Sequence, residues 1–428
     1  MNCKKKLMLF TLTSWVQRMD VNRTIGYMDN ARKRLGFSHF EVFGVNQHSC
    51  IGKRWSARQV FGLDIRQVFI VRIWYSPEEI YSFQTNNILD GLLLLGKNQK
   101  FSCAERVSLP QTTDKKSWIA NREGSNIFNH EVETMQMQRK CIEESNVEFI
   151  DNTVSEIERL YFNSVGGILY QRAFKNSTVF GFNNNRLFLR TYFSDKPFLL
   201  EKFAAFESDF IEKNHLFSVK NITDSMRKLP IVLSGFAAYQ IFNEYSSIFE
   251  NKEESLKFLE DSNSNIIVED FCDECEIGYI PKFDEEGTLT RNNIFFQRGR
   301  FVADMCTRTS AEKRGEKPSG NAHYMTAKRL KPNYLYVHSN DYQRCIYNEF
   351  YLIDSIKSFG MKTFDIKQKI SVPVSGFLFI DGVPHRYFEK YFSFSISNLL
   401  SEAIVFEEKT KVGFGCSHSL HLPKAVLI

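Results

Sequence analysis

The sequence lacks the features that mark several protein classes. No window approaches the roughly 20 apolar residues that a membrane helix needs, so we expect no membrane association. There is no internal repeat at a fixed period and no low-complexity stretch. The G-x-S-x-G elbow, the Walker loop, H-E-x-x-H and G-x-G-x-x-G are all missing, so no common signature indicates a reaction.

The apolar content is ample for a folded protein. The chain has 428 residues, of which 43% are hydrophobic and 40 are Phe, and this length predicts two or three domains. Mixed strand and helix patterns predict a multi-domain α+β protein. We expect a mixed α/β domain over 1–150, a helix-rich domain with a β-hairpin over 151–265, and a basic antiparallel-sheet, nucleic-acid-binding domain over 266–428.

Several segments carry clear secondary-structure signals. The spacing Thr153-Val154-Ser155-Glu156 is that of a capping box and predicts a helix start. Asn183-Asn184-Asn185 lies between two strand-like runs and predicts a hairpin, because Asn tolerates positive φ. Runs rich in β-branched and aromatic residues predict strands at 40–45, 67–75, 334–338, 350–354, 371–381 and 391–397.

The cysteines and the N-terminus indicate a reducing compartment. The nine cysteines are an odd number and mostly lie far apart, which argues for free thiols and a cytoplasmic protein. Lys4-Lys5-Lys6 followed by the apolar run 7–12 imitates a secretory signal. However, that run is short and broken by polar residues, so we expect a strand instead.

One cysteine pair has the spacing of half a zinc knuckle. Cys272 and Cys275 are separated by two residues, so their thiolates could bind one tetrahedral ion. The second half is missing, and the partners available at a distance are Cys306, His323, His338 and Cys345. We therefore expect no required cofactor, with a structural zinc ion as the alternative to two ordinary cysteines in an acidic turn.

Charge is distributed unevenly although the net charge is only +5. Residues 260–286 hold ten acidic side chains and one basic one, whereas 291–331 hold ten basic and three acidic ones. Cations beside aromatic rings are what single-stranded nucleic acids bind, and the alternative is a solvated face paired with the acidic tract. The predicted contacts from this tract include Arg298, Arg300, Lys328, Arg329 and Lys331.

The C-terminal segment carries a family resemblance. A strand with alternating apolar residues at 392–396 is followed, after about twenty residues, by Gly413-Phe414-Gly415-Cys416-Ser417-His418-Ser419-Leu420-His421-Leu422-Pro423. This arrangement resembles the tail of the type I-F CRISPR repeat-processing endoribonucleases of the RAMP superfamily. The run 336–339, followed by 350–353, resembles that family's other strand.

The resemblance implies a ferredoxin-like (RAMP-type) antiparallel domain and metal-independent RNA cleavage by the 2′-OH. His418 and His421 would be the acid–base residues, because imidazole titrates near neutrality, and Ser417 would be a positioning hydroxyl. Arg308 and Arg314 would join Arg298 and Arg300 as phosphate contacts. The family usually has Tyr where this chain has Phe414, which places cleavage itself in question.

These observations lead to one preferred function and two alternatives. The preferred function is RNA binding, with a CRISPR RNA hairpin as ligand and other effector-complex subunits as partners. One alternative is a zinc-containing DNA-binding or replication accessory protein organised around Cys272 and Cys275. The other is a non-catalytic structural subunit.

Overall fold

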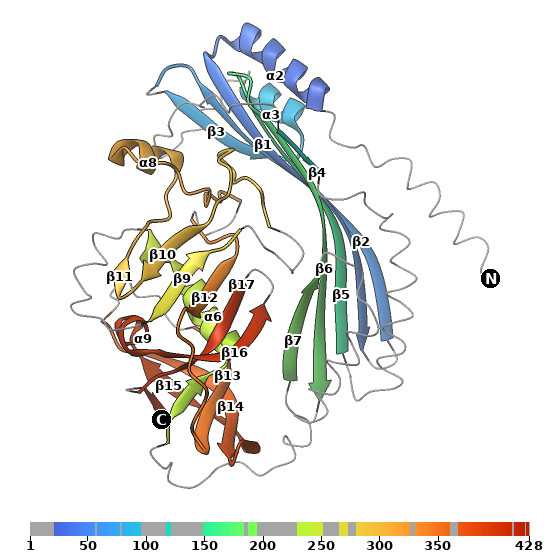
Figure 1. Ribbon diagram of the computed structural model, residues 1–428. Helices are drawn as coiled ribbons and strands as arrows, with labels where there is room; N and C mark the ends of the chain where they lie inside the picture. Colours follow the sequence, from blue (N-terminus) through green and yellow to red (C-terminus); the bar gives the residue numbers. More distant parts are fainter. Residues whose placement is uncertain are drawn as a thin grey trace, which may run out of the picture. The chain divides into compact units, whose positions relative to one another are not determined.

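The structure is a computed structural model (Figure 1). It describes residues 21–55, 58–77, 79–95, 117–120, 149–183, 187–194, 229–250, 265–272, 280–325, 330–359, 367–412, 415–423 and 425–427. The chain divides into two compact units, the first drawn from Met1–His48, Ile65–Asn121 and Ile157–Arg172, and the second from Ser49–Asp64, Arg122–Glu156 and Ala173–Ile428. In the described ranges, no helix is both long and apolar enough to cross a membrane.

The N-terminal sheet has seven described strands. Their order is β3-β2-β1-β5-β6-β4, and β7 pairs with β6. The strands are β1 (His39–Trp55), β2 (Arg58–Trp74), β3 (Ile80–Thr85), β4 (Ser117–Ala120), β5 (Phe149–Asn163), β6 (Ile168–Asn183) and β7 (Leu187–Ser194). Apolar residues of one face, including Phe40, Val42 and Leu160, form a core with the helices α2 (Val21–Leu35) and α3 (Ile88–Leu95).

The other face of this sheet buries charge. Glu41 alternates with the core residues Phe40 and Val42, so its side chain points to the opposite side. Arg72 Nη1 lies 2.5 Å from Glu41 Oε1, and the Tyr161 hydroxyl donates to Glu41 Oε2 at 3.0 Å. All three side chains are buried, so the ion pair is satisfied by its own neighbours rather than by water.

The C-terminal sheet has eleven described strands. Its order is β11-β10-β9-β12-β17-β8-β13-β14-β15-β18, and β16 pairs with β17. The strands are β8 (Ile231–Leu233), β9 (Ile266–Asp270), β10 (Asn293–Gln297), β11 (Arg300–Phe301), β12 (Leu335–Ser339), β13 (Glu349–Ile356), β14 (Ile370–Ile380), β15 (Val383–Phe394), β16 (Ile404–Val412), β17 (Gly415–His421) and β18 (Val426–Leu427). Most pairs are antiparallel, but β12–β17 and β8–β13 are parallel.

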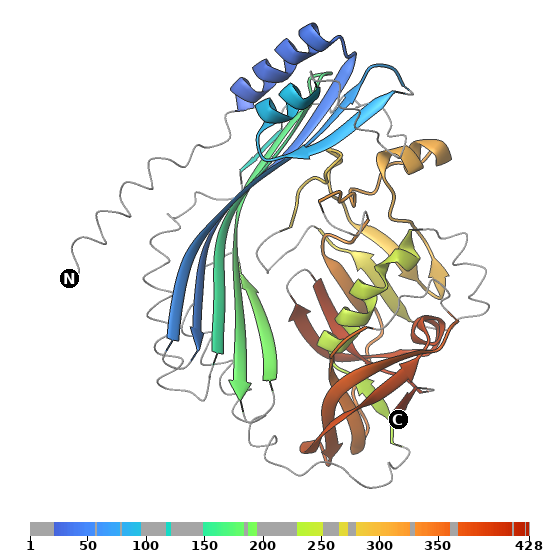
Figure 2. The same ribbon diagram turned by 180° about the vertical axis from the view of Figure 1, so that it is seen from behind.

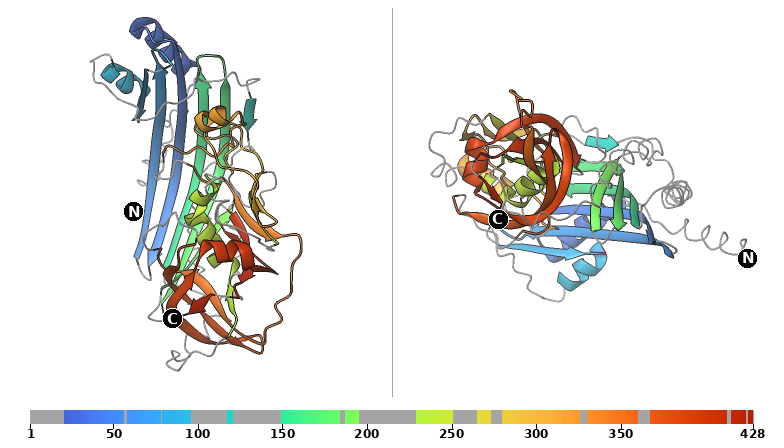
Figure 3. Two further views of the ribbon diagram at one scale, coloured as in Figure 1. Left: turned by 90° about the vertical axis from the view of Figure 1, so that its left-hand side faces the viewer. Right: turned by 90° about the horizontal axis from the view of Figure 1, so that it is seen from below.

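Helix α6 (Gly235–Glu244) covers the central strands of this sheet. It packs against β12, β13, β16 and β17 and lies across one face, around which the strands curve (Figures 2 and 3). The Ser234 side chain caps the helix by accepting from the Ala237 backbone N–H at 3.2 Å. A Cβ at Gly235 would stand 2.2 Å from the Ser417 carbonyl oxygen, so a glycine is what allows the helix to start against β17.

The remaining helical segments of this unit are short. They are the 3-10 turn η1 (Ser246–Phe249), α8 (Arg308–Arg314) and α9 (Ile396–Glu402). Between β9 and β12, buried carboxylates hold the loops. Asp284 accepts from the backbone N–H groups of Thr288 at 2.9 Å and Ala322 at 3.1 Å, and Glu286 accepts from the Arg308 N–H at 2.5 Å. These bonds fix the loops to the turn at 284–286.

Several sequence-based expectations can now be compared with the fold. The mostly β-sheet composition with a few helices fits the expected α+β class, and the strands expected at 40–45, 67–75, 334–338, 350–354 and 371–381 are present. The hairpin at Asn183 is also present as β6 and β7, with Asn183 opposite Leu187. The division into three domains stays a prediction. The expected strand at 7–12 lies outside the described residues.

Three structural expectations were wrong in whole or in part. The strand expected over 391–397 ends at Phe394, because the Ser395 side chain caps helix α9 by accepting from the Asn398 backbone N–H. Residues 153–156 lie in strand β5 rather than starting a helix, and the buried Ser155 hydroxyl lies 2.9 Å from the Ser49 hydroxyl of β1. In place of a ferredoxin-like βαββαβ arrangement, the C-terminal strands form one eleven-stranded sheet with two parallel pairs.

Candidate functional site

The three residues predicted to be catalytic all lie in β17, and all are buried. His418 and His421 are three positions apart in a strand, so they do not share a face. Their contacts differ accordingly, because the His418 ring stacks on Tyr342 and the His421 Nδ1 lies 2.8 Å from the Tyr347 hydroxyl. Ser417 Oγ donates to the His418 carbonyl oxygen at 3.0 Å. The structure therefore does not bring the three side chains together.

Around β17, the two faces of the C-terminal sheet differ in their side chains, one apolar and the other polar and aromatic. Leu335 and Val337 of β12 belong to the apolar core that includes α6. A Cβ at Gly415 would lie 2.3 Å from the Tyr239 ring of α6, so β17 also approaches the helix closely on this side. Tyr336 and His338 alternate with the core residues and therefore lie on the opposite face.

That opposite face gathers polar and aromatic side chains from four strands or the segments that follow them. We call this set the imidazole–tyrosine face, and its members are Glu269, Tyr336, His338, Tyr342, Lys409 and His418. Tyr336 stacks on His338 with ring centroids 4.2 Å apart, and Tyr342 stacks on His418 at 4.4 Å. The Lys409 ammonium lies 5.0 Å above the Tyr336 ring, a cation–π contact.

Hydrogen bonds fix the protonation of both imidazoles in this face. His338 Nε2 lies 2.8 Å from Glu269 Oε1 and His418 Nδ1 lies 2.9 Å from the Phe406 carbonyl oxygen. A carboxylate and a carbonyl only accept, so these two nitrogens carry the protons. In the neutral rings, the lone pairs are therefore on Nδ1 of His338 and Nε2 of His418.

The surroundings also shift the pKa values of the ionisable side chains. Burial lowers the pKa of His418, and the nearby Lys409 and His338 lower it further, so His418 is neutral at pH 7. Burial, with a contribution from Tyr336, raises the pKa of Tyr342 to about 12. The two tyrosines thus remain protonated hydroxyl groups at neutral pH.

The basic residues predicted to bind RNA have other surroundings in the structure. Arg298 and Gly299 both have positive φ, 51° and 72°, and form the tight turn between β10 and β11, followed by the exposed Arg300. Arg308 is buried and donates to the Glu286 carbonyl oxygen at 3.0 Å, and Arg314 is paired with Asp304.

Of the remaining members of the basic tract, Lys331 lies in the described part of the chain. It is partly buried and its backbone N–H donates to the Asn321 carbonyl oxygen at 3.3 Å, while Lys328 and Arg329 lie outside the described residues. Two aromatic rings of this tract, those of Phe295 and Phe296, are 0% exposed and lie in the core. Arg308 contacts the preceding acidic tract, because its backbone N–H donates to the Glu286 carboxylate and its guanidinium group donates to the Glu286 carbonyl oxygen.

A metal ion has no obvious ligand set among the described residues. Cys272 is a buried free thiol packed with Ile280, Tyr334 and Cys416, and Cys275 lies outside the described residues. Across the described ranges, no three His, Cys, Asp or Glu side chains are grouped so that they could share an ion. Because His338 is already bonded to Glu269 and stacked on Tyr336, it is not oriented toward His418 as a second ligand.

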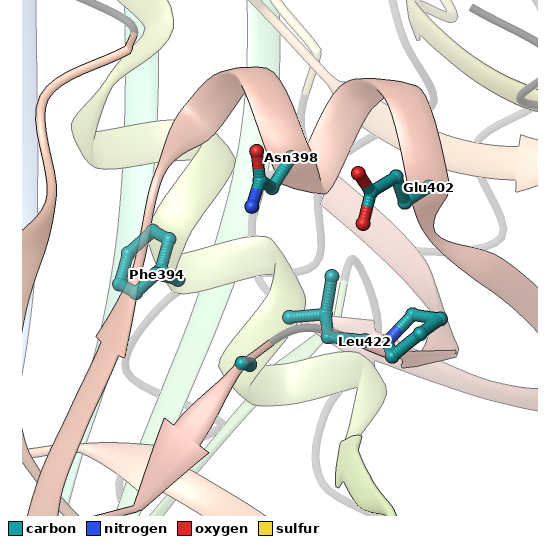
Figure 4. Close-up of a pocket in the computed structure, with 6 residues that line it drawn as sticks. Phe394, Asn398, Glu402 and Leu422 are labelled. Atoms are coloured by element: carbon teal, nitrogen blue, oxygen red, sulfur yellow. The ribbon is translucent and has the colours of Figure 1, made fainter.

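A separate hollow lies beside α9 (Figure 4). Its lining is formed by Phe394, Asn398, Glu402, Leu422, Pro423 and Ala425. Its cavity volume is about 10 Å³, room for roughly one water molecule, whereas ligand pockets usually have roughly 300–1,000 Å³. This hollow is too small to be the main ligand site.

Comparison with known proteins gives a different relationship from the one suggested by the C-terminal motif. Residues 227–427, slightly less than half of the chain, match the family described as the PmbA/TldA metallopeptidase C-terminal domain. No curated protein matches the chain.

Solved structures resemble the chain over nearly its whole length. TldE from Thermococcus kodakarensis has a TM-score of 0.74 and 14% identity, covering 94% of this chain and 99% of its own. A protein of Thermotoga maritima described as a candidate modulator of a DNA gyrase has a TM-score of 0.70 and 12% identity, with coverages of 94% and 99%. A similarly described protein from Bacteroides thetaiotaomicron has a TM-score of 0.70 and 11% identity, with coverages of 96% and 99%. These similarities establish the fold.

The comparisons correct the expected function. The proposed kinship with CRISPR endoribonucleases was wrong, because the segment that carried it lies within the match to the metallopeptidase C-terminal domain. The expectations of RNA as ligand and of CRISPR effector subunits as partners fall with that kinship. The assignment of His418, His421 and Ser417 as catalytic stays a prediction without a supporting reaction.

Most residues of the imidazole–tyrosine face were not expected from the sequence to belong to a site. Glu269, Tyr336, Tyr342 and Lys409 were not singled out as site residues, and His338 was considered only as a zinc ligand. One signal was available, since Leu335-Tyr336-Val337-His338 alternates apolar with polar or aromatic residues, as a strand with one ligand-accessible face does.

Proposed function

We propose that this chain is a subunit of a PmbA/TldD-type peptidase assembly that does not itself supply the catalytic metal. The observation that carries the proposal is a combination of two facts. The C-terminal part matches a metallopeptidase domain, yet the described residues provide no group of three ligands for a metal ion. The residues present do not fit a metal centre, so we derive no hydrolytic step from them.

The proposed function requires a partner, which is a related chain that binds the catalytic metal ion. The resemblance to TldE covers 94% of this chain and 99% of that protein, which supports a subunit with the same fold over nearly the whole matched length. Such a subunit would contribute binding surface and correct assembly, whereas hydrolysis would occur on the partner. The proposal therefore assigns this chain a structural and peptide-binding role.

A cytoplasmic location agrees with this proposal. The four described cysteines Cys272, Cys306, Cys345 and Cys416 are free thiols. Free thiols persist in reducing compartments, so we extend the proposal to a cytoplasmic assembly.

The test is to purify the full chain alone and together with a metal-binding PmbA/TldD-type chain from the same organism. Zinc per chain would be measured by mass spectrometry, complex formation by light scattering, and hydrolysis with an unstructured peptide. We expect the chain alone to contain no stoichiometric zinc and to be inactive. We expect it to form a complex with its partner and to increase the partner's hydrolysis rate.

Two results would overturn the proposal. One is a stoichiometric zinc ion together with peptide hydrolysis by this chain alone. The other is a failure to associate with any metal-binding relative from that organism at micromolar concentrations, the range in which specific subunit interfaces form.

A further inference from the structure

The imidazole–tyrosine face has polar atoms that the fold itself does not use. The apolar side of β12 and β17 meets α6, so the sheet is already stabilised on that side. On the opposite side, Tyr342 is 37% exposed and Lys409 is exposed, while Tyr336 and His338 are partly exposed. A ligand arriving from solvent can therefore reach two phenol rings, an ammonium group and an imidazole.

The first recognition element is a positive charge without a matching acid. Lys409 lies directly opposite His418 in the β16–β17 register, and its ammonium group sits over the Tyr336 ring. Among the described residues, Lys409 forms no ion pair, because the adjacent Glu407 is bonded to Arg344 and Glu269 to His338. An exposed ammonium held by a ring attracts a carboxylate.

The second element is a hydrogen-bond acceptor in a fixed orientation. The Glu269 carboxylate keeps the proton of His338 on Nε2. The lone pair on Nδ1 of the partly exposed His338 can therefore accept an N–H group of a ligand. His418 is only 5% exposed and stacks on Tyr342, so it supports the Tyr342 ring rather than contacting the ligand.

The third element is an aromatic surface. One side of the Tyr342 ring stacks on His418, so its exposed area offers the other side to an apolar or aromatic group. A ring surface next to a cation and an acceptor matches the end of a peptide, which combines a carboxylate, an amide N–H group and a side chain.

We infer that the imidazole–tyrosine face binds the C-terminal end of a short extended peptide, with the terminal carboxylate at Lys409. An amide N–H group lies toward His338, and the last side chain lies against Tyr342. This inference rests on the proposed function, since it names the peptide ligand that a peptidase-type subunit would hold. It assigns a binding role, so none of these residues needs to act as an acid or base.

The experiment compares three probes on the full-length chain labelled with ¹⁵N-histidine. The probes are the tripeptide Gly-Gly-Phe, its C-terminal amide, and acetate. Calorimetry gives the dissociation constants, and the imidazole ¹⁵N signals, assigned with His418→Gln and His338→Gln, locate the ligand. We expect the free acid to shift both imidazole signals and to bind about tenfold more tightly than the amide, as for the loss of one charge-assisted hydrogen bond.

The decisive variant is Lys409→Gln, with Lys313→Gln on an exposed position of α8 as its matched control. In Lys409→Gln, the acid and the amide should bind equally weakly, whereas Lys313→Gln should bind like the unmodified chain. Equal affinities of acid and amide in the unmodified chain would overturn the inference, as would tight binding that survives Lys409→Gln. Acetate that reproduces the shifts at the same affinity would reduce the site to a simple anion site and would also overturn it.

Failure of this test is distinguishable from failure of the proposed function. Zinc content and complex formation with a metal-binding relative are measured without any peptide. A chain that assembles normally but does not bind the tripeptide would refute only the peptide site.

Discussion

The two sheets of this molecule bury charged groups by different means. In the N-terminal sheet, Glu41 and Arg72 neutralise one another through side chains on neighbouring strands. In the loop between β9 and β10 of the C-terminal sheet, Asp284 and Glu286 accept from backbone N–H groups, among them those of Thr288, Ala322 and Arg308. The first arrangement depends on the presence of the opposite charge, whereas the second depends on the conformation of the loops. Substitution and pH should therefore affect the two sheets differently.

The largest effect should come from breaking the N-terminal ion pair. Arg72→Met leaves the Glu41 carboxylate buried without the opposite charge of Arg72, although the Tyr161 hydroxyl still donates to it. We expect a loss of about 3–5 kcal/mol in unfolding free energy, measured by urea denaturation. The double variant Glu41→Gln with Arg72→Met should recover part of this loss. Equal stability of the single and double variants would contradict the charge-pair explanation.

A smaller effect on stability should distinguish alanine substitutions of two helical glycines, one in each region. A Cβ at Gly235 meets the Ser417 carbonyl oxygen at 2.2 Å, whereas a Cβ at Gly26 of α2 meets nothing within 4 Å. Gly235→Ala should destabilise by about 2 kcal/mol because the helix must move away from β17. Gly26→Ala should stabilise by about 0.5–1 kcal/mol through helix propensity. Thermal unfolding of both variants tests the pair, and the same sign for both would refute the close approach of α6.

Another comparison concerns the pH dependence of the C-terminal unit. Burial, followed by the neighbouring Glu286, raises the pKa of Asp284 to about 7. Since the unfolded value is lower, the folded state binds the extra proton, and this contribution to stability is lost as the pH rises from about 4 to 7. Asp284→Asn should remove that dependence and cost about 1 kcal/mol through a weakened bond to the Ala322 N–H.

Urea unfolding of Asp284→Asn at several pH values between 4 and 8 measures this effect. A stability–pH slope unchanged from that of the unmodified chain would show that Asp284 does not hold the proton. Asp304→Asn is a useful comparison, because that carboxylate is paired with Arg314 rather than with backbone groups.

The sequence predicted local structure better than it predicted the site. Strand β12 was expected because apolar and polar residues alternate over 334–338, and that pattern depends only on neighbouring positions. The capping-box interpretation of Thr153–Glu156 was wrong because these residues belong to strand β5, where Ser155 meets Ser49 of β1, a residue remote in sequence. Local patterns do not encode such pairings.

The candidate site could not be assembled from the sequence for the same reason. Its residues come from β9, β12, β16, β17 and the segment after β12, and only the parallel pairing of β12 with β17 brings Tyr336 near His418. The C-terminal motif also misdirected the functional hypothesis, because a short glycine-containing tail is compatible with many tight turns. Arg298 lies with Gly299 in the hairpin turn between β10 and β11, at a position where the sequence had suggested a nucleic-acid contact.

The position of β17 has a consequence for how the protein is made. This strand is formed by residues 415–421, yet it lies in the middle of the C-terminal sheet between β12 and β8. During synthesis, β8, β9 and β12 emerge from the ribosome long before the strand that joins them. The sheet therefore closes only after residues 415–421 have been released, and the edges of β12 and β8 that pair with β17 stay unpaired until then.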